Sequence, residues 1–173
     1  MAAAVAYKLV QEGKGDYIAG LVSMNGLHCH PDATPAEYKH LMTSYVDNAG
    51  PLPLVSGDDT LGLYTYRNIE PPNTDTKIFP AAGGASAVKG FPPTYIVTSD
   101  NDASRDDGTV FAAALKDAGV PVKLDNIKGF AHYFWTFPLA KANAHFWSKL
   151  YDGIKWTLEQ RASSLENGVH GAA

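Results

Sequence analysis

The chain has 173 residues, which is enough for a single domain with a sizeable core. Hydrophobic residues make up 45% of it and charged residues 18%, fractions typical of globular proteins. The formal net charge of −4 at pH 7 gives no reason to expect nucleic acid or an anionic membrane as a partner.

The beginning of the chain predicts a helix. The first residues, MAAAVAYKLVQEG, place their apolar side chains at helical spacing over residues 2–12, and Gly13 is a fitting end. They lack the basic start and long apolar core of a signal peptide. No apolar run in the chain approaches the roughly 18 residues that a membrane-spanning helix needs. The single cysteine, Cys29, excludes an internal disulfide and fits a reducing compartment, so we expect a cytoplasmic protein.

A first strand is predicted over residues 17–24, an apolar run typical of a parallel strand covered on both faces. His28, Cys29 and His30 follow it. Two imidazoles and a thiol this close together suggest a metal site, but their spacing does not match the known zinc patterns. We instead expect these three residues to lie at the mouth of a pocket as substrate contacts, and we expect no metal and no cofactor.

The next part of the chain predicts one helical segment and a long connection. Thr34, Pro35 and Glu37 form the pattern of a capping box, so a helical segment is expected within residues 34–50. Residues 50–93 are rich in Pro, Gly, Asn and Asp, and contain one short helical piece near residues 61–66. Several apolar residues in this connection indicate that it packs over the surface.

A strand–helix–strand unit is predicted after this connection. Residues 94–98 are rich in β-branched and aromatic residues, residues 105–118 carry apolar positions at helical spacing, and residues 122–127 form a second strand. Asp102 follows the first of these strands and His132 follows the second. Because functional sites in open α/β sheets gather at the carboxyl ends of the strands, we expect these two side chains at the same edge.

The pairing of a carboxylate with an imidazole has a chemical meaning. The carboxylate holds the imidazole in one tautomer and stabilises the imidazolium, which makes the histidine a better general base. Asp102 and His132 therefore look like two members of a Ser-His-Asp triad, in the order found in α/β-hydrolases. Taken singly, Asp102 would be a helix N-cap and His132 a hydrogen-bonded core histidine.

The end of the chain is predicted to be aromatic and then helical. Tyr133, Phe134 and Trp135 either wall an apolar substrate pocket beside His132 or pack in the core beneath the last helix. That helix is expected from about residue 141 to 162, and Gly153 should weaken it locally. Residues 163–173 are small and polar, so we expect a frayed tail on a single domain that spans residues 1–173.

Two segments resemble the hormone-sensitive-lipase branch of the α/β-hydrolases, which includes plant and fungal carboxylesterases. Members carry a PP-(strand)-x-D-P-L-R-D-E-G segment and, further along, G-x-x-H-x-F. The matching residues here are Pro92-Pro93, Asp102-Ala103-Ser104-Arg105-Asp106-Asp107-Gly108 and Gly129-Phe130-Ala131-His132-Tyr133-Phe134. The resemblance covers nearly the whole chain and is weak from Thr34 to Ala85. It implies that Asp102 is the triad acid and His132 the base, and that Asp106 and Asp107 open the following helix, where carboxylates suit the helix dipole.

The same resemblance implies a fold that is only partly represented. The nucleophile elbow, G-D-S-A-G-G, and the H-G-G-G segment that supplies oxyanion donors would both precede residue 1. We therefore expect a partial α/β-hydrolase fold, with three or more parallel strands flanked by helices but without the N-terminal half of the sheet. Ser56 and Ser86 lack the G-x-S-x-G pattern and are expected to be loop serines, and Cys29 fits a small buried residue better than a nucleophile.

The exposed strand edge left by the missing half is expected to associate. A second copy of the chain, a complementing N-terminal polypeptide or a rearrangement would cover it. The leading functional hypothesis is a carboxylic ester hydrolase that acts on a small apolar ester through Asp102, His132 and a serine from elsewhere. The alternative is a non-hydrolytic half-hydrolase that binds a small apolar ligand, or catalyses its isomerisation or cyclisation with His132 as acid and base. A third reading is a truncated product without independent function.

Overall fold

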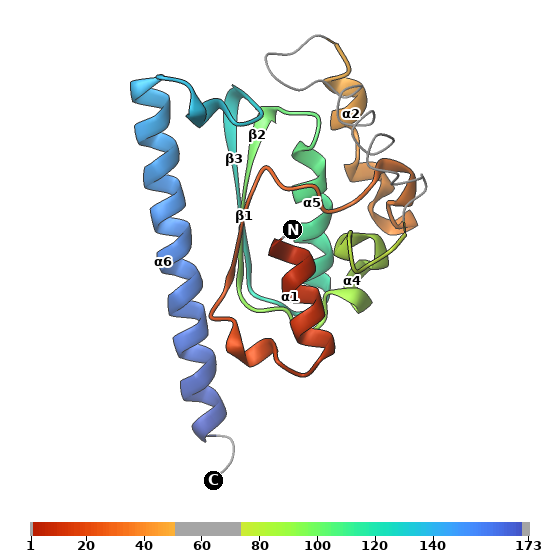
Figure 1. The fold of residues 1–173 in the computed structure, drawn as a ribbon, viewed down its shortest axis with the longest axis vertical. Coiled ribbons are helices and arrows are strands. Elements are labelled where there is room, and N and C mark those ends of the chain that lie inside the picture. Colours follow the sequence, from red (N-terminus) through yellow and green to blue (C-terminus); the bar gives the residue numbers. More distant parts are fainter. Residues whose placement is uncertain (1, 51–73, 171–173) are drawn as a thin grey trace.

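A computed structural model describes residues 2–50 and 74–170. Its centre is a sheet of three parallel strands (Figure 1), whose order is β1 (Leu21–Met24), β2 (Thr94–Asn101) and β3 (Val122–Ala131). Leu21 pairs with Thr94, and Thr94 in turn pairs with Val122. The predicted class, parallel strands flanked by helices, is confirmed.

The strand ends differ from the predicted ones. β1 begins four residues later than predicted, because Gly15–Tyr17 form the 3-10 turn η1 ahead of it. β3 continues beyond residue 127 through Gly129, whose φ of 80° is a conformation that glycine adopts readily. The register between β2 and β3 shifts between Ser99 and Asn101, where the longer β3 has extra residues. Beyond the shift Asn101 pairs with Ala131, so the strands are still paired at the edge where the predicted site residues follow.

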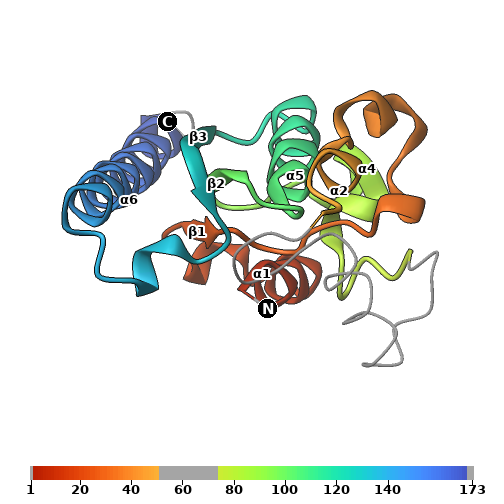
Figure 2. The same ribbon diagram turned by 90° about the horizontal axis from the view of Figure 1, so that it is seen from above.

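Helices cover both faces of the sheet. α1 (Ala2–Gln11) and α5 (Arg105–Asp117) pack on one face, and α6 (Ala140–His170) packs on the other (Figure 2). A short turn, η5 (Phe134–Thr136), leads into α6. The other short helices gather on the α5 side: η2 (Pro31–Ala33), η3 (Ala36–Leu41), α2 (Ser44–Asp47), η4 (Pro80–Gly83) and α4 (Gly84–Ala87).

The helical segment expected within residues 34–50 forms as two short pieces, η3 and α2. The predicted capping box is wrong, because the Thr34 hydroxyl donates to the carbonyl of His30 and does not accept from a backbone N–H at the start of η3. Pro35 occupies the N-cap position of η3 and makes no side-chain cap bond. Most of the predicted connection over residues 50–93, including the helical piece near 61–66, lies outside the described residues.

β2 is buried on both faces, as the central strand of a covered sheet should be. Successive strand side chains point to opposite faces, so Ile96 packs toward α1 and α5 while Tyr95 and Val97 pack toward α6. The first of these two layers includes Ala3, Ala6, Leu21, Val110, Phe111 and Leu115, and the second includes Ile127, Phe134, Phe146 and Leu150. The sheet is therefore held between two separate apolar layers.

α6 lies close against the sheet at Gly153. A Cβ atom at this position would overlap the ring of Tyr95, so the glycine that weakens the helix locally is what allows the close packing. The helix extends past the end predicted at residue 162, to His170, and the hydroxyl groups of Ser163 and Ser164 bond to carbonyls one turn earlier. Among residues 2–50 and 74–170, no helix combines the length and apolar character needed to cross a membrane.

Replacing Gly153 by Ala should lower the free energy of unfolding by about 1–3 kcal/mol, because the added methyl group overlaps the Tyr95 ring. At an unconstrained helix position the same change would stabilise by about 0.5–1 kcal/mol, so the sign separates packing from helix propensity. Urea unfolding measures the difference. Ser163→Ala, at an exposed position of α6, is the control and should shift the value by less than about 0.5 kcal/mol. A Gly153→Ala chain as stable as the unsubstituted one would contradict this account.

Candidate active site

The carboxyl ends of β2 and β3 bring Asp102 and His132 into contact. Asp102 directly follows the last residue of β2, and His132 directly follows the last residue of β3. The Nδ1 atom of His132 lies 2.7 Å from Oδ2 of Asp102. Asp102 is 1% exposed and His132 8%, so the pair lies just beneath the surface at the edge of the sheet.

The second carboxylate oxygen of Asp102 is also occupied. Oδ1 accepts hydrogen bonds from the backbone N–H of Ser104, at 2.8 Å, and from its hydroxyl, at 2.9 Å. With the carboxylate accepting on Oδ2, the hydrogen-bond network assigns the imidazole proton to Nδ1. Nε2 then carries the lone pair, and among the described residues it has no hydrogen-bond partner. The arrangement can therefore accept a proton at Nε2 while the carboxylate supports the resulting charge.

Tyr133 forms the rim beside the imidazole. Its ring lies 4.0 Å from that of His132, and the residue is 46% exposed. Its backbone takes the left-handed conformation, with φ 53°, which is uncommon for a residue other than glycine. Tyr133 directly follows His132 and is the N-cap residue of η5, so this left-handed residue is where the chain turns from the end of β3 into η5.

The other two predicted aromatic contacts face the interior. Phe134 is 3% exposed and belongs to the layer between the sheet and α6. Trp135 stacks on Phe146 of α6, with ring centroids 4.3 Å apart and ring planes 5° apart. Of the three aromatic residues predicted as substrate contacts, Tyr133 is the one with a large exposed surface next to His132.

Comparison with known proteins identifies the family. Residues 1–136 match the model of a family described as the alpha/beta hydrolase fold. The chain belongs to the α/β-hydrolase family. It is 35% identical over 145 residues to a versiconal hemiacetal acetate esterase of Dothistroma septosporum, a match that covers 84% of this chain and 43% of that protein. A versiconal hemiacetal acetate esterase of Emericella nidulans is 31% identical over 166 residues, covering 92% of this chain and 56% of the relative.

The solved structure of brefeldin A esterase, described as a bacterial homologue of human hormone-sensitive lipase, shares the fold. The TM-score is 0.72 and the identity 21%, over 93% of this chain and 45% of that one. The family match and the esterase relatives together place the chain among the carboxylesterase-like α/β-hydrolases. The chain spans about half the length of the two esterase relatives described above.

His28, Cys29 and His30 occupy the interior of this α/β-hydrolase chain, each less than 5% exposed. His28 stacks on Phe111 of α5 and bonds through Nε2 to the hydroxyl of Ser23, and its burial lowers its pKa to about 3. Burial raises the pKa of the Cys29 thiol to about 12, so this thiol stays protonated at neutral pH. The hydrogen bonds and ring contacts described here join these side chains to other residues, and a role as substrate contacts stays a prediction for all three. Within residues 2–50 and 74–170, no group of three or more His, Cys, Asp or Glu is placed to hold a metal ion.

A second carboxylate, Asp107, anchors the loop that contains His28. Its Oδ1 accepts from the N–H groups of His28 and Cys29, and its Oδ2 accepts from the hydroxyl of Tyr45. Asp107 is fully buried, and this burial raises its pKa to about 7, with the nearby charge of Asp102 acting in the same direction. The residue predicted to open α5 therefore also ties α5 to the loop after β1.

Residues 43–48 contact the segment 102–104 between β2 and α5, which is called the acid loop below. The hydroxyl of Ser44 donates to the carbonyl of Ala103, and the side-chain amide of Asn48 donates to the carbonyl of Asp102. Asp106 of α5 adds a bond to residues 43–48, because its Oδ2 accepts from the N–H of Ser44 at 2.7 Å. These partners are 54 to 62 positions apart in the sequence, so no local pattern points to them.

Ser104 is the neighbour of the pair that the sequence could have indicated. A serine two residues after an aspartate commonly bonds back to the aspartate side chain in a turn, and the sequence Asp102-Ala103-Ser104 has this spacing. The serines considered as nucleophiles lie elsewhere. Ser86 is exposed in α4 and donates to the carbonyl of Gly83, and Ser56 lies outside the described residues.

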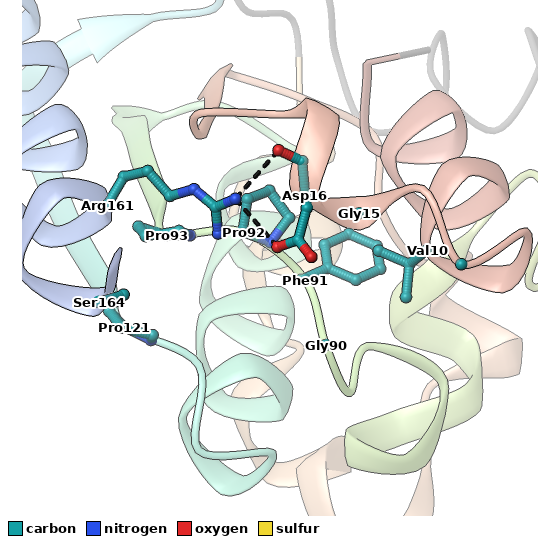
Figure 3. Close-up of a pocket in the computed structure, with 11 residues that line it drawn as sticks. Val10, Gly15, Asp16, Gly90, Phe91, Pro92, Pro93, Pro121, Arg161 and Ser164 are labelled. Carbon is teal, nitrogen blue, oxygen red and sulfur yellow. Dashed lines mark hydrogen bonds and ion pairs between the residues drawn. The ribbon is translucent and has the colours of Figure 1, made fainter. Parts of the chain in front are cut away.

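A cavity of about 360 Å³ lies at the opposite, amino edge of the sheet, away from the Asp102–His132 pair (Figure 3). Pro93 and Pro121, the residues just before β2 and β3, contribute to its wall. Arg161 of α6 reaches across it and bonds to Asp16 at 2.9 Å. Because α/β folds place their chemistry at the carboxyl ends of the strands, this cavity is not the candidate active site.

Removing the Asp107 carboxylate should destabilise the chain strongly. Asp107→Ala leaves two buried N–H groups and one hydroxyl without their acceptor, each costing about 1–3 kcal/mol. Asp107→Asn is the matched control, because its carbonyl oxygen still accepts from both N–H groups and the Tyr45 hydroxyl is free to rotate. Denaturant unfolding should show a loss of several kcal/mol for the Ala variant and a much smaller loss for Asn. Equal losses would show that the hydrogen bonds of the carboxylate are not the cause.

The raised pKa of Asp107 predicts a pH dependence of stability. The folded chain holds this proton up to pH about 7, whereas an unfolded aspartate releases it near pH 3.9. Between these values the folded state binds more protons than the unfolded state, so the free energy of unfolding falls as pH rises. Unfolding curves at pH 4.5 and 7.5 should show the unsubstituted chain losing stability relative to Asp107→Asn, which does not titrate at this position. Parallel pH dependences for the two proteins would contradict the raised pKa.

Proposed function

We propose that this chain carries the acid and the base of a carboxylic ester hydrolase. The observation that carries the proposal is the 2.7 Å bond between Asp102 and Nδ1 of His132, at the edge where α/β folds place their chemistry. The esterase relatives support ester hydrolysis as the reaction. The protein would act without a metal or organic cofactor, because the chemistry needs a nucleophile, a proton carrier and a charge stabiliser.

In the proposed mechanism, a serine hydroxyl attacks the carbonyl carbon of the ester while Nε2 of His132 takes its proton. The imidazolium then gives that proton to the leaving alcohol, and the acyl group stays on the serine oxygen. Water attacks the acyl-enzyme in the second half of the reaction, again losing a proton to Nε2. Asp102 stays ionised throughout and stabilises the imidazolium through the bond to Nδ1.

The serine would come from outside these 173 residues, because the chain contains no G-x-S-x-G sequence. β1 is paired with β2 and, among the described strands, with no other, so its outer edge has unpaired N–H and C=O groups. A strand that carries the nucleophile would fit that edge. A second copy of this chain would cover it without supplying a serine on such a turn, so we favour a complementing segment over a homodimer.

The proposed substrate is a small ester with an apolar alcohol part. Tyr133 offers an exposed aromatic face beside His132, which suits an apolar group more than a charged one. The name of the two esterase relatives, versiconal hemiacetal acetate esterase, makes an acetate ester the first class of substrate to test. A small acyl group of this kind would leave most of the contact area to the alcohol part.

Substitutions in the pair should abolish hydrolysis of p-nitrophenyl acetate by the complemented enzyme. The assay uses the chain co-expressed with the nucleophile-bearing half of an esterase of this family. Asp102→Asn should lower kcat by on the order of 10⁴, because the imidazole loses its preferred tautomer. His132→Ala should lower it further, by on the order of 10⁶.

Arg161→Ala is the control for that assay, since Arg161 contacts Asp16 at the far edge of the sheet and should leave kcat unchanged. A serine-directed phosphonate tests the source of the nucleophile and should label the complementing segment rather than this chain. Full activity in His132→Ala would overturn the proposal. Labelling of this chain alone would overturn the external origin of the serine.

A further inference from the structure

Ser104 differs from the family pattern in a way that bears on the acid. The D-P-L-R-D-E-G segment of the resembled family has an apolar leucine two residues after the aspartate, whereas this chain has a serine. The side chain is 1% exposed, so its hydroxyl is directed into the protein rather than to solvent. A buried hydroxyl in place of an apolar group needs a hydrogen-bond partner.

The hydroxyl of Ser104 finds that partner on the carboxylate of Asp102. Its Oγ lies 2.9 Å from Oδ1 of Asp102 and 3.5 Å from Nδ1 of His132, and its N–H also donates to Oδ1. Ser104 stands at the N-cap position of α5, where serine commonly caps the helix, yet its side chain makes no cap bond there. The hydroxyl is therefore used for the carboxylate instead of for the helix.

The bonds that Ser44 and Asn48 make to the acid loop hold its backbone and do not touch the Asp102 carboxylate. Asn48 bonds to the carbonyl of Asp102, and Ser44 bonds to the carbonyl of Ala103. The last torsion of an aspartate side chain is broad, so backbone contacts alone do not fix the plane of the carboxylate. Among the described residues, Ser104 and His132 are the ones that bond to its oxygen atoms.

We propose that Ser104 is a positioning residue of the Asp102–His132 pair. Its hydroxyl and its backbone N–H both donate to Oδ1, and the second bond, from the hydroxyl, fixes the carboxylate plane so that Oδ2 faces Nδ1. This inference rests on the proposed esterase function for its catalytic meaning, although the positioning itself does not. Ser104 is not the nucleophile, because its oxygen lies on the Nδ1 side of the imidazole and the mechanism takes the serine proton at Nε2.

The test compares Ser104→Ala with Ser44→Ala, which removes a buried hydroxyl of α2 that bonds to the backbone of the acid loop and does not touch the Asp102 carboxylate. The first readout is the low-field proton NMR resonance of the Nδ1–H of His132 in this chain. In Ser104→Ala the carboxylate keeps the bond from the backbone N–H of residue 104 and loses the one from the hydroxyl. The resonance should move and broaden, because the less firmly held carboxylate lets the proton exchange faster with water. In Ser44→Ala it should stay as in the unsubstituted chain.

The second readout is hydrolysis of p-nitrophenyl acetate by the complemented enzyme. Ser104→Ala should lower kcat about tenfold and leave KM within about twofold, because the lost bond supports the charged pair and not the bound ester. A resonance and a kcat that are unchanged in Ser104→Ala would overturn the proposal. So would equal changes in both variants, since these would reflect general loosening of the loop. If the resonance responds to Ser104→Ala alone while every complemented enzyme is inactive, the esterase function fails and the positioning role stands.

Discussion

The parallel register of β2 and β3 is the constraint on which the site depends. The strands are paired from Thr94 with Val122 to Asn101 with Ala131, so the residues that follow them meet at one edge. A shift of one residue would turn the side chains of a whole strand to the other face and separate the imidazole from the carboxylate. β2 lies between two apolar layers, one against α1 and α5 and one against α6, and both layers hold this register. The 2.7 Å bond at the edge is thus set by the core.

The acid loop adds a second level of control, because buried carboxylates are unfavourable unless they are hydrogen-bonded. Three aspartates lie within six positions, and each has its own partners. Asp102 binds His132 and Ser104, Asp106 binds residues 43 and 44 together with Arg105, and Asp107 binds the loop after β1. The carboxylate with the proposed catalytic role therefore lies close in sequence to two others, which connect α5 to residues 43–44 and to the loop after β1.

The sequence predicted the elements that depend on short-range patterns. Apolar runs and helical spacing indicated the three strands and the helices on both sides, and strand ends marked Asp102 and His132. It failed where the contact that a residue makes differs from the one its local pattern indicates. Thr34 looked like a helix cap but bonds to His30, and Gly153 looked like a weak point but makes room for Tyr95. The contacts of Ser44 and Asn48 with the acid loop join segments far apart in the chain, so only the folded structure shows them.

The path of the chain after β3 indicates where a nucleophile would have to stand. Adjacent strands lie about 4.8 Å apart, so a strand added outside β1 would be about 10 Å from β2 and about 15 Å from β3. A histidine pointing straight up from β3 would not reach such a strand. The segment after β3 instead turns back over the edge of the sheet toward the β1 side before entering η5 (Figure 2), with Gly129 and Tyr133 both at positive φ. The bond of the imidazole to Asp102 holds it near the end of β2, which is one strand nearer than β3 to the outer edge of β1. A nucleophile on a strand outside β1, as proposed above, would therefore be about one strand spacing nearer to this imidazole than to the end of β3.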